Sequence, residues 1–480
     1  MSIKSNAGLD AIFHPRSIAI VGATAGPDNI YTQMFLKSLL DFRFEGPIYP
    51  VNPKADSVMG LKTYPTVLDV PGPVDYAISL IPASATPQLM RECVAKGVRA
   101  VQLFTAGFDE TGEQDRTRLQ EDLAAMARRG GVRLLGPNCV GIYCPESRMS
   151  YASDFPKEVG RVGFIAQSGG YTYLTARIAA ARGVRFSKMV SYGNASDINE
   201  IELLEYLAND PGTDVICVYI EGTRDGQRHL RVLAEATARK PVVVIKRGHT
   251  EGGRRGARSH TGALAGDDMM WDVAFRQAGV IRVEDVEELV DMMVTFLFFP
   301  LPRGRKVVLV GGGGGASVRA ADQCEAGGLR LPPLPDDLRE EVNRHIPLAG
   351  SMLTNPMDVL VEAHGGIPSW ISILAALDCW EGADMFLWQV CPEMPPFRED
   401  IFSQLIIEVR TQMLEEYKAL RKPKVVVVHA VETMFGLREL DAIRAKCADE
   451  GVAFYPSVLR AARAISRCMD YWDWRGRRAS

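Results

Sequence analysis

Three segments of this 480-residue chain open in the same way, and that repetition constrains the fold more than any other feature. In each segment a short apolar strand runs into a glycine-rich turn and then into a helical pattern. Strands that alternate with helices build doubly wound α/β domains, which bind ligands at the carboxyl ends of their parallel strands. The three openings are SIAIVGATAG from Ser17, RVGFIAQSGGY from Arg161 and KVVLVGGGGGAS from Lys306.

Each opening begins a series of β-branched runs, so we predict three α/β domains, as the length also suggests at roughly 150 residues per domain. Turn-rich stretches near 151–160 and 300–304 separate the series and give the boundaries 1–150, 151–300 and 301–480. The first series holds candidate strands at 17–22, 48–52, 75–81, 99–105 and 133–136. The second and third hold 161–166, 187–192, 214–220, 241–247 and 280–283, then 306–310, 384–390, 424–429 and 452–455.

Composition excludes several classes of protein. The net charge is -4, whereas nucleic-acid binders carry a basic excess, so we expect no nucleic-acid partner. The longest apolar run, 292–301, is far shorter than the roughly 20 residues that span a bilayer, and the N-terminus has no signal-peptide pattern. We therefore expect a cytoplasmic protein without a membrane segment. Nine cysteines form no C-x-x-C pair, which predicts reduced thiols and no metal site.

The first glycine loop, Gly22–Gly26, does not read G-x-G-x-x-G, the fingerprint of a nicotinamide dinucleotide site. Where an acidic residue would bind a ribose diol after the second strand, the chain has Lys54. A lysine there favours a nucleotide with an extra phosphate near its ribose. Coenzyme A and NADP both fit that feature, and a purely structural need for glycine at the turn is an equal alternative for one loop alone.

The second loop places Ser168 on a strand-to-helix turn, but it lacks the first glycine of the G-x-S-x-G nucleophile elbow of hydrolases. We interpret Ser168, Gly169 and Gly170 as a cradle for a phosphoryl group, because backbone N–H groups at a helix N-terminus bind anions.

His260 differs from the other six histidines because it lies in RSHTGALAG, which predicts an accessible imidazole in a small-residue loop ahead of a helix capped by Asp267 or Asp268. Glu221 follows the predicted strand 214–220, at the sheet edge where sites form. A carboxylate there could hold one ring nitrogen and leave the other nucleophilic. The alternatives are a plain loop histidine, and a salt bridge from Glu221 to Arg224 or Lys246.

Taken in order, these motifs resemble the NDP-forming acyl-CoA synthetases, relatives of the succinyl-CoA synthetase alpha subunit, with the ADP-forming acetyl-CoA synthetase alpha chain most similar. The resemblance covers nearly the whole chain. Its motifs are VGATAG, IYPVNPK, AGFDETG, RLLGPNCVGI, IAQSGG, SYGNASDINEIELLEYLANDP, YIEG, KPVVVIKRG, SHTGALAG, GVIRVEDVEEL, TNPMDV and YPSVLRAARAI.

The resemblance implies a Rossmann-like CoA-binding domain followed by two flavodoxin-like ligase domains. It also implies that His260 is phosphorylated, that Glu221 orients it, and that Ser168, Gly169 and Gly170 hold phosphate. CoA would be bound by the first loop, the segment 81–83 and the segment 137–138. The individual CoA-binding residues that it implies are Gly22, Thr24, Lys54, Pro82 and Asn138.

The implied reaction joins a small carboxylic acid to CoA at the expense of an NTP, through an acyl phosphate and a phosphohistidine. The chain offers no room for an ATP-grasp domain, so a separate beta subunit would hold the NTP and Mg²⁺ in a hetero-oligomer. Two rival interpretations stay open: a non-catalytic CoA-binding regulatory or scaffold protein of the same fold, and an NADP-type oxidoreductase.

Overall fold

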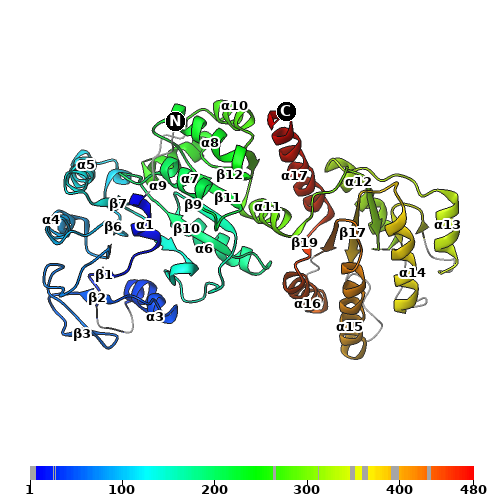
Figure 1. Cartoon of the computed structure of the whole chain (residues 1–480), viewed down its shortest axis with the longest axis horizontal. Helices are drawn as coiled ribbons and strands as arrows, with labels where there is room; N and C mark the ends of the chain where they lie inside the picture. The colour runs from blue at the N-terminus through cyan, green and yellow to red at the C-terminus, as the bar shows by residue number, and fades with distance from the viewer. Residues whose placement is uncertain are drawn as a thin grey trace. The chain divides into compact units, whose positions relative to one another are not determined.

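The computed structural model describes residues 7–24, 26, 29–262, 266–311, 313–345, 352–358, 366–390, 399–429 and 434–479. These residues form two compact units (Figure 1). The first unit consists of Met1–Ala180 and Arg185–Leu289, and the second of Ala181–Val184 and Val290–Ser480. The first unit contains two large sheets and the second contains one.

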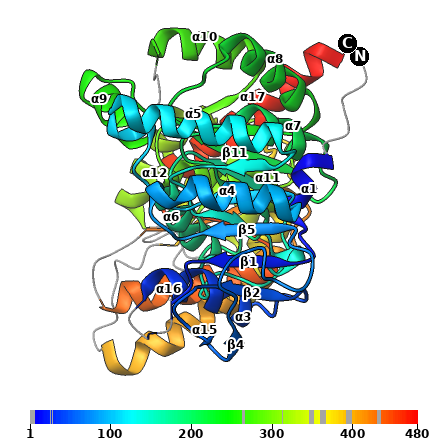
Figure 2. The same cartoon turned by 90° about the vertical axis from the view of Figure 1, so that its left-hand side faces the viewer.

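The N-terminal sheet of the first unit is entirely parallel, with strand order β2-β1-β5-β6-β7. Its strands are short and buried because helices cover them; α4 and α5 lie side by side along the sheet (Figure 2). The strands are β1 (Ile18–Val21), β2 (Ile48–Val51), β5 (Tyr76–Ser79), β6 (Ala100–Leu103) and β7 (Arg133–Leu135), and β3 (Ser57–Val58) and β4 (Leu61–Lys62) form a small separate ribbon. The helices are α1 (Ala7–Phe13), α2 (Ile30–Thr32), a π-helical turn (Gln33–Lys37), α3 (Ser38–Asp41), α4 (Thr86–Lys96) and α5 (Gln114–Arg129).

The second sheet of this unit has the order β13-β12-β11-β9-β10-β8, and only its edge strand β8 is antiparallel. β8 comes from residues 141–143, which precede position 150, yet it pairs with β10 of this sheet. The strands are β8 (Gly141–Tyr143), β9 (Val162–Ala166), β10 (Phe186–Ser191), β11 (Val215–Ile220), β12 (Val242–Lys246) and β13 (Ile281–Val283). The helices are α6 (Gly169–Ala180), α7 (Glu200–Asn209), α8 (Gly226–Arg239), α9 (Glu251–Thr261) and α10 (Asp268–Ala278).

The second unit is built on a sheet of order β15-β16-β14-β17-β18-β19, in which the edge strand β15 is antiparallel. Its core joins aromatic and branched side chains of the sheet and of the helices that cover it, such as Trp370, Trp388 and Tyr417. The strands are β14 (Val307–Val310), β15 (Met352–Leu353), β16 (Met357–Asp358), β17 (Met385–Val390), β18 (Lys424–Val428) and β19 (Ala453–Tyr455). The helices are α12 (Gly314–Ala326), α13 (Asp336–Asn343), α14 (Gly366–Cys379), α15 (Glu399–Lys418), α16 (Met434–Glu450) and α17 (Val458–Ala479), and α11 (Val286–Phe298) joins the two units in sequence.

The predicted α/β class, with an N-terminal parallel sheet and two further doubly wound sheets, is confirmed. Every strand predicted from the sequence overlaps an observed one. The described cysteines are free thiols, and all of them except Cys379 are buried. Within the described residues, no helix combines the length and hydrophobicity that crossing a membrane requires.

Candidate active site around His260

His260 lies in the last turn of helix α9, so the prediction that it occupies a loop is wrong. The helix forms despite three glycines because Thr250 caps its start, its hydroxyl accepting a hydrogen bond from the N–H of Gly253 at 3.0 Å. Gly262, with φ +68°, ends the helix in the left-handed conformation that favours glycine. The prediction left the cap of the following helix, α10, between Asp267 and Asp268; Asp267 is the cap, because its side chain accepts a hydrogen bond from the N–H of Met269. His260 is therefore presented by a helix terminus, and its side chain is 46% exposed.

Glu221 contacts His260 directly. The Nδ1–H of His260 donates to Oε1 of the Glu221 carboxylate at 2.8 Å. The carboxylate is 3% exposed, and two hydroxyl groups hold it in place: Thr261 Oγ1 donates to Oε2 at 2.8 Å, and the Tyr219 hydroxyl donates to Oε1 at 3.2 Å. The carboxylate is therefore fixed with one oxygen on the imidazole and the other on the residue next to it.

The alternative partners of Glu221 make different contacts. Arg224 pairs with Asp109 at 3.8 Å, and the ammonium of Lys246 lies over the Trp271 ring, 5.2 Å from its centroid. Burial lowers the pKa of Lys246 to about 8, which weakens it further as a counter-ion. Of the three candidate partners, His260 is thus the one whose side chain forms a hydrogen bond with the Glu221 carboxylate.

The carboxylate sets the electrostatics of the imidazole. The hydrogen bond that Nδ1–H donates to Glu221 raises the pKa of His260 above its ordinary value, while partial burial acts in the opposite direction. A carboxylate on Nδ1 also selects the tautomer in which Nδ1 carries the proton. Nε2 is then the nitrogen with the free lone pair, the form that a nucleophilic histidine needs.

A pocket of about 480 Å³ opens beside His260 and brings several of the predicted residues together. Asn138 fixes the geometry here, because its side-chain amide donates to the backbone carbonyl of His260 at 3.0 Å. The sequence-predicted residues in the lining are Pro82, Asn138, Gly169, Gly170 and His260, and the others are Tyr31, Leu80, Phe104, Thr105, Ala106, Cys139 and Val140.

Helix α6 begins at this pocket. Gly169 is its first residue, and a Cβ there would lie 2.8 Å from the Val140 side chain, so only glycine fits. Ser168, 7% exposed, directly precedes the helix. Because the first N–H groups of a helix have no partner within it, and the dipole is positive at that end, the terminus is suited to a phosphate group.

The remaining predicted CoA-binding residues lie at the carboxyl ends of β1 and β2, outside the lining of this pocket. Gly22 has φ +92°, and a Cβ there would lie 2.9 Å from the side chain of Ile81, so the turn requires glycine. The N–H of Thr24 donates to the Thr32 hydroxyl at 3.0 Å, while the buried Thr24 hydroxyl has no hydrogen-bond partner among the described residues. Lys54 is exposed. An exposed cation and an orphaned hydroxyl at adjoining strand ends fit the phosphates of a nucleotide.

Two protein-family models match the part of the chain that holds the two sheets of the first unit. Residues 16–145 match a CoA binding domain, and residues 159–296 match a succinyl-CoA ligase like flavodoxin domain. The chain is 33% identical to the alpha subunit of ADP-forming acetate–CoA ligase I of Pyrococcus furiosus, over 98% of this chain and 99% of that protein. It is 37% identical to the alpha subunit of isoenzyme II of the same organism, over 74% and 77% of the two chains.

The chain belongs to the family of ADP-forming acetate–CoA ligase alpha subunits. A solved structure agrees: dinucleotide forming acetyl-coenzyme A synthetase 1 of Ca. Korarchaeum cryptofilum, in complex with phosphate and ADP, has a TM-score of 0.80 and 30% identity over 98% of this chain and 97% of that one. The resemblance and the enzyme class, an acid–thiol ligase with a CoA-binding domain, are confirmed. Relatives named as alpha subunits imply a beta-subunit partner.

Sequence reasoning missed residues that support the histidine of this ligase subunit. The side-chain oxygen of Gln167 accepts hydrogen bonds from the N–H groups of Glu221 at 2.5 Å and of Gly222 at 3.1 Å, which holds the end of β11 in place. Thr261 was also missed as a partner of Glu221. The one signal in the sequence was that both residues are next to predicted site residues, since Gln167 precedes Ser168 and Thr261 follows His260. The direction in which each side chain points is a tertiary property.

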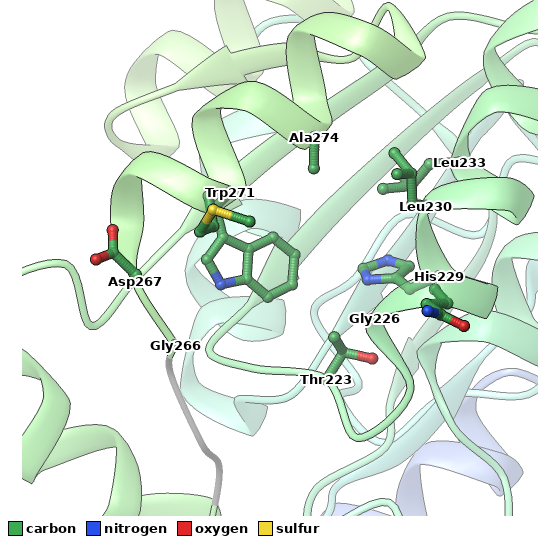
Figure 3. A pocket seen from close by; sticks show the side chains of 11 residues that line it. Thr223, Gly226, His229, Leu230, Leu233, Gly266, Asp267, Trp271 and Ala274 are labelled. Atoms are coloured by element: carbon green, nitrogen blue, oxygen red, sulfur yellow. The ribbon is translucent and has the colours of Figure 1, made fainter.

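Two further pockets lie in the first unit of this ligase subunit. One, of about 390 Å³, is polar and includes Gln167, Asn194, Arg224 and Thr261. The other, of about 340 Å³, is mainly apolar and lies between α8 and α10, where Trp271 and His229 face each other with ring centroids 5.6 Å apart (Figure 3). Burial lowers the pKa of His229 to about 4, so this ring is neutral and belongs to the apolar packing.

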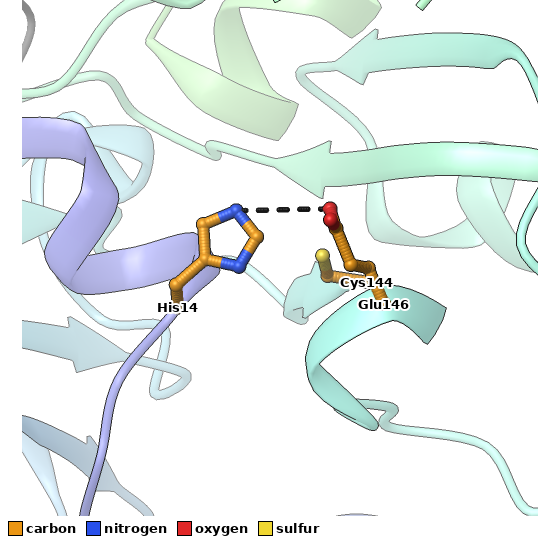
Figure 4. A group of neighbouring side chains, drawn as sticks. All are labelled: His14, Cys144 and Glu146. Carbon is orange, nitrogen blue, oxygen red and sulfur yellow. Dashed lines mark ion pairs between the residues drawn. The ribbon is translucent and has the colours of Figure 1, made fainter. Parts of the chain in front are cut away.

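One group of metal-binding residue types meets in the first unit, at His14, Cys144 and Glu146 (Figure 4). Their ligand atoms lie within 4.8 Å of one another, and Nε2 of His14 is 4.0 Å from the Glu146 carboxylate. The buried ammonium of Lys188 is 3.6 Å from the same carboxylate. Because a cation already faces Glu146, and burial raises the pKa of the Cys144 thiol, we interpret this group as an ion-pair cluster.

Proposed function

We propose that this chain is the subunit of an ADP-forming acyl-CoA synthetase that binds CoA and carries a transient phosphate on His260. The observation that carries the proposal is the Glu221–His260 pair, 2.8 Å apart, beside a pocket that also contains the N-terminus of α6. An orienting carboxylate, a nucleophilic nitrogen and an anion-binding helix end are the parts that phosphoryl transfer through histidine requires.

In the proposed reaction, Nε2 of His260 takes the γ-phosphoryl group of an NTP and the NDP leaves. The substrate carboxylate then takes the phosphoryl group to form an acyl phosphate, and the CoA thiolate attacks the acyl carbon and releases inorganic phosphate. Glu221 serves the first two steps, because its charge stabilises the cationic ring of phosphohistidine through Nδ1–H. Ser168 and the N–H groups of Gly169 and Gly170 bind the phosphoryl oxygens.

The CoA-binding part of the proposal rests on the strand ends of the N-terminal sheet. Gly22 and Thr24 would hold the diphosphate, Lys54 the 3′-phosphate, and Pro82 and Asn138 the arm that leads to the pocket. Since Pro82 and Asn138 share the pocket lining with His260, a thiol delivered along them would reach the acyl phosphate formed there. The NTP and Mg²⁺ belong on an ATP-grasp beta subunit, so the working enzyme is a hetero-oligomer. Acetate, the acid in the relatives' names, is one candidate substrate.

The test is phosphate transfer to this chain. Incubation with γ-labelled NTP, Mg²⁺ and the beta subunit should label the chain with an acid-labile, base-stable phosphate, and His260→Ala should abolish the label. His249→Ala is the matched control, because this exposed histidine of the same unit should leave the label unchanged. Label that persists in His260→Ala would move the nucleophile to another residue. CoA binding without any label in the wild-type complex would favour a scaffold protein instead.

A further inference from the structure

Two aromatic rings line the pocket beside His260, and they have no role in the proposed phosphoryl transfer. Tyr31 and Phe104 lie with their ring centroids 5.0 Å apart, and Phe104 in turn rests on Phe35 with centroids 5.2 Å apart. Phe35 is buried at 2% exposure, whereas Tyr31 is 52% exposed. The core thus supports a firm aromatic wall whose outer ring is open to a ligand.

The start of α6 gives the same pocket unfilled space. A Cβ at Gly170 would meet a single atom, Oγ of Ser168, at 3.8 Å, which is ordinary van der Waals contact. At the neighbouring Gly169 a Cβ would collide with Val140. The backbone at Gly170 therefore does not need glycine for lack of room, and the missing side chain leaves volume beside the phosphate-binding helix end.

The charge of the lining restricts what can fill that volume. Among the described residues that line the pocket, His260 is the only one whose side chain can carry a charge near neutral pH. The reacting carboxylate of the substrate accepts the phosphoryl group and becomes an acyl phosphate. A second carboxylate would be buried without a counter-ion, which is costly.

We propose that the acid activated here is a monocarboxylic acid with a bulky apolar group, preferably an aromatic ring, and that Tyr31 and Phe104 are the residues that select it. This inference rests on the proposed function. An aromatic substrate ring gains offset or edge-to-face contacts with these two rings as well as burial, whereas acetate has only a methyl group to bury and no ring to stack. A dicarboxylic acid such as succinate is disfavoured by the uncharged lining.

The competing role for the two rings is contact with the arm of CoA, which must reach the same pocket. The two roles predict different kinetic changes. Rings that select the acid alter the ratio of kcat/KM between acids, at any CoA concentration. Rings that guide CoA alter KM for CoA by the same factor whichever acid is used.

The experiment uses the complex with the beta subunit and compares phenylacetate, acetate and succinate as acids. In the wild type we expect kcat/KM to fall in that order. Tyr31→Ala and Phe104→Ala should each lower the phenylacetate-to-acetate ratio about tenfold or more, the usual scale for lost contacts in an apolar pocket. Gly170→Ala should lower the same ratio by filling the space beside the helix. Ile30→Ala is the matched control, because Ile30 precedes Tyr31, is 74% exposed and is absent from the lining, so the ratio should stay unchanged.

Acetate preferred over phenylacetate in the wild type, or ratios that Tyr31→Ala and Phe104→Ala leave unaltered, would overturn the inference. A rise in KM for CoA with no change in the ratio would likewise assign the rings to CoA. In both cases the phosphohistidine label on His260 would still form, so the proposed function would stand. A complex that neither labels His260 nor activates any of the three acids would remove the proposed function, and the inference with it.

Discussion

The glycine loops before α6 and α12 look alike in sequence but differ in what faces them. Both follow a buried parallel strand and begin a helix of at least twelve residues. At α12 the N–H of Gly313 donates to Oδ1 of Asp358 at 3.0 Å. At α6 the described lining around Gly169 and Gly170 contains no carboxylate. The α12 terminus therefore already holds an anionic side chain, whereas the α6 terminus is open.

This difference shows that a strand, glycine turn and helix define a potential anion site and that one long-range contact decides its use. Asp358 lies on β16, forty-five positions from Gly313 in the chain. It is 6% exposed, and burial raises its pKa although the hydrogen bond from Gly313 acts in the opposite direction. The folded protein thus keeps a carboxylate at one helix terminus and leaves the other for a ligand.

The largest effect should come from making the open site resemble the occupied one. Gly170→Asp adds a carboxylate beside the first N–H groups of α6, and its charge should repel phosphate. We expect phosphorylation of His260 to fall by about 100-fold or more, the range seen when anion stabilisation is lost at an active site. Helix stability should not suffer, because an acidic residue is favourable in the first turn. The measurement is the initial rate of label incorporation.

Gly170→Asn is the matched control for this prediction, because asparagine has the same shape without the charge. It should retain much more activity than Gly170→Asp. Equal losses in the two variants would mean that space at Gly170, and not charge, matters there.

Glu221→Gln should change the pH dependence of the open site. The hydrogen bond that His260 donates to Glu221 raises the pKa of His260, so the neutral, nucleophilic ring is populated only as the pH rises through that raised value. Without the Glu221 carboxylate, burial is the larger of the two remaining influences and lowers the pKa of His260, while the charge of Glu110 raises it, so the inflection in rate should move to lower pH. The maximal rate should fall by about 10- to 100-fold, as for other orienting carboxylates. An inflection at an unchanged pH would show that another group controls this titration.

The sequence predicted most of the parallel strands and the Glu221–His260 pair for one reason. Parallel strands bring their carboxyl ends to one edge, so a glutamate after a strand and a histidine in a nearby glycine-flanked segment are drawn together. The conformation of 251–261 was not predictable, since EGGRRGARSHT contains three glycines, which disfavour a helix, and has no apolar stripe. Tertiary burial of Ala257 and Thr261 supports that helix.

The contacts that distinguish the two glycine loops could not be predicted from local sequence patterns. Asp358 lies in TNPMDV, whose letters give no sign that the carboxylate turns to α12. The edge strand β8 was missed because three residues are too few for a periodic pattern, and its antiparallel pairing with β10 depends on the completed sheet. Long-range partners of this kind decide which potential sites are open.

A smaller effect should follow from loosening Glu221 without removing it. Thr261→Val keeps the shape of the side chain but removes the hydroxyl that donates to Oε2. Loss of one buried hydrogen bond to a charged group, about 1.5 to 3 kcal/mol at most, should slow phosphorylation of His260 by about tenfold. KM for CoA should stay the same, and Thr261→Ser should restore the rate. A Ser variant as slow as Val would assign Thr261 to packing.

The smallest effect should come from the reverse exchange, which opens the occupied site. Asp358→Asn keeps an oxygen for the N–H of Gly313 and removes the charge. Because burial raises the pKa of Asp358, its charged form is held less well in the folded state than in the unfolded chain, and this cost is complete above the raised value. The variant should therefore be more stable near neutral pH, by about 1 kcal/mol or less. The stability advantage of the variant should vanish as the pH falls below the ordinary pKa of aspartate.

Thermal unfolding with and without inorganic phosphate measures both the stability of the variant and its affinity for an anion. Phosphate should raise the unfolding midpoint more in Asp358→Asn than in the wild type. A variant that is less stable at every pH, with no gain from phosphate, would mean that Asp358 stabilises the loop as a charged cap and that the two helix ends differ in more than the presence of an anion.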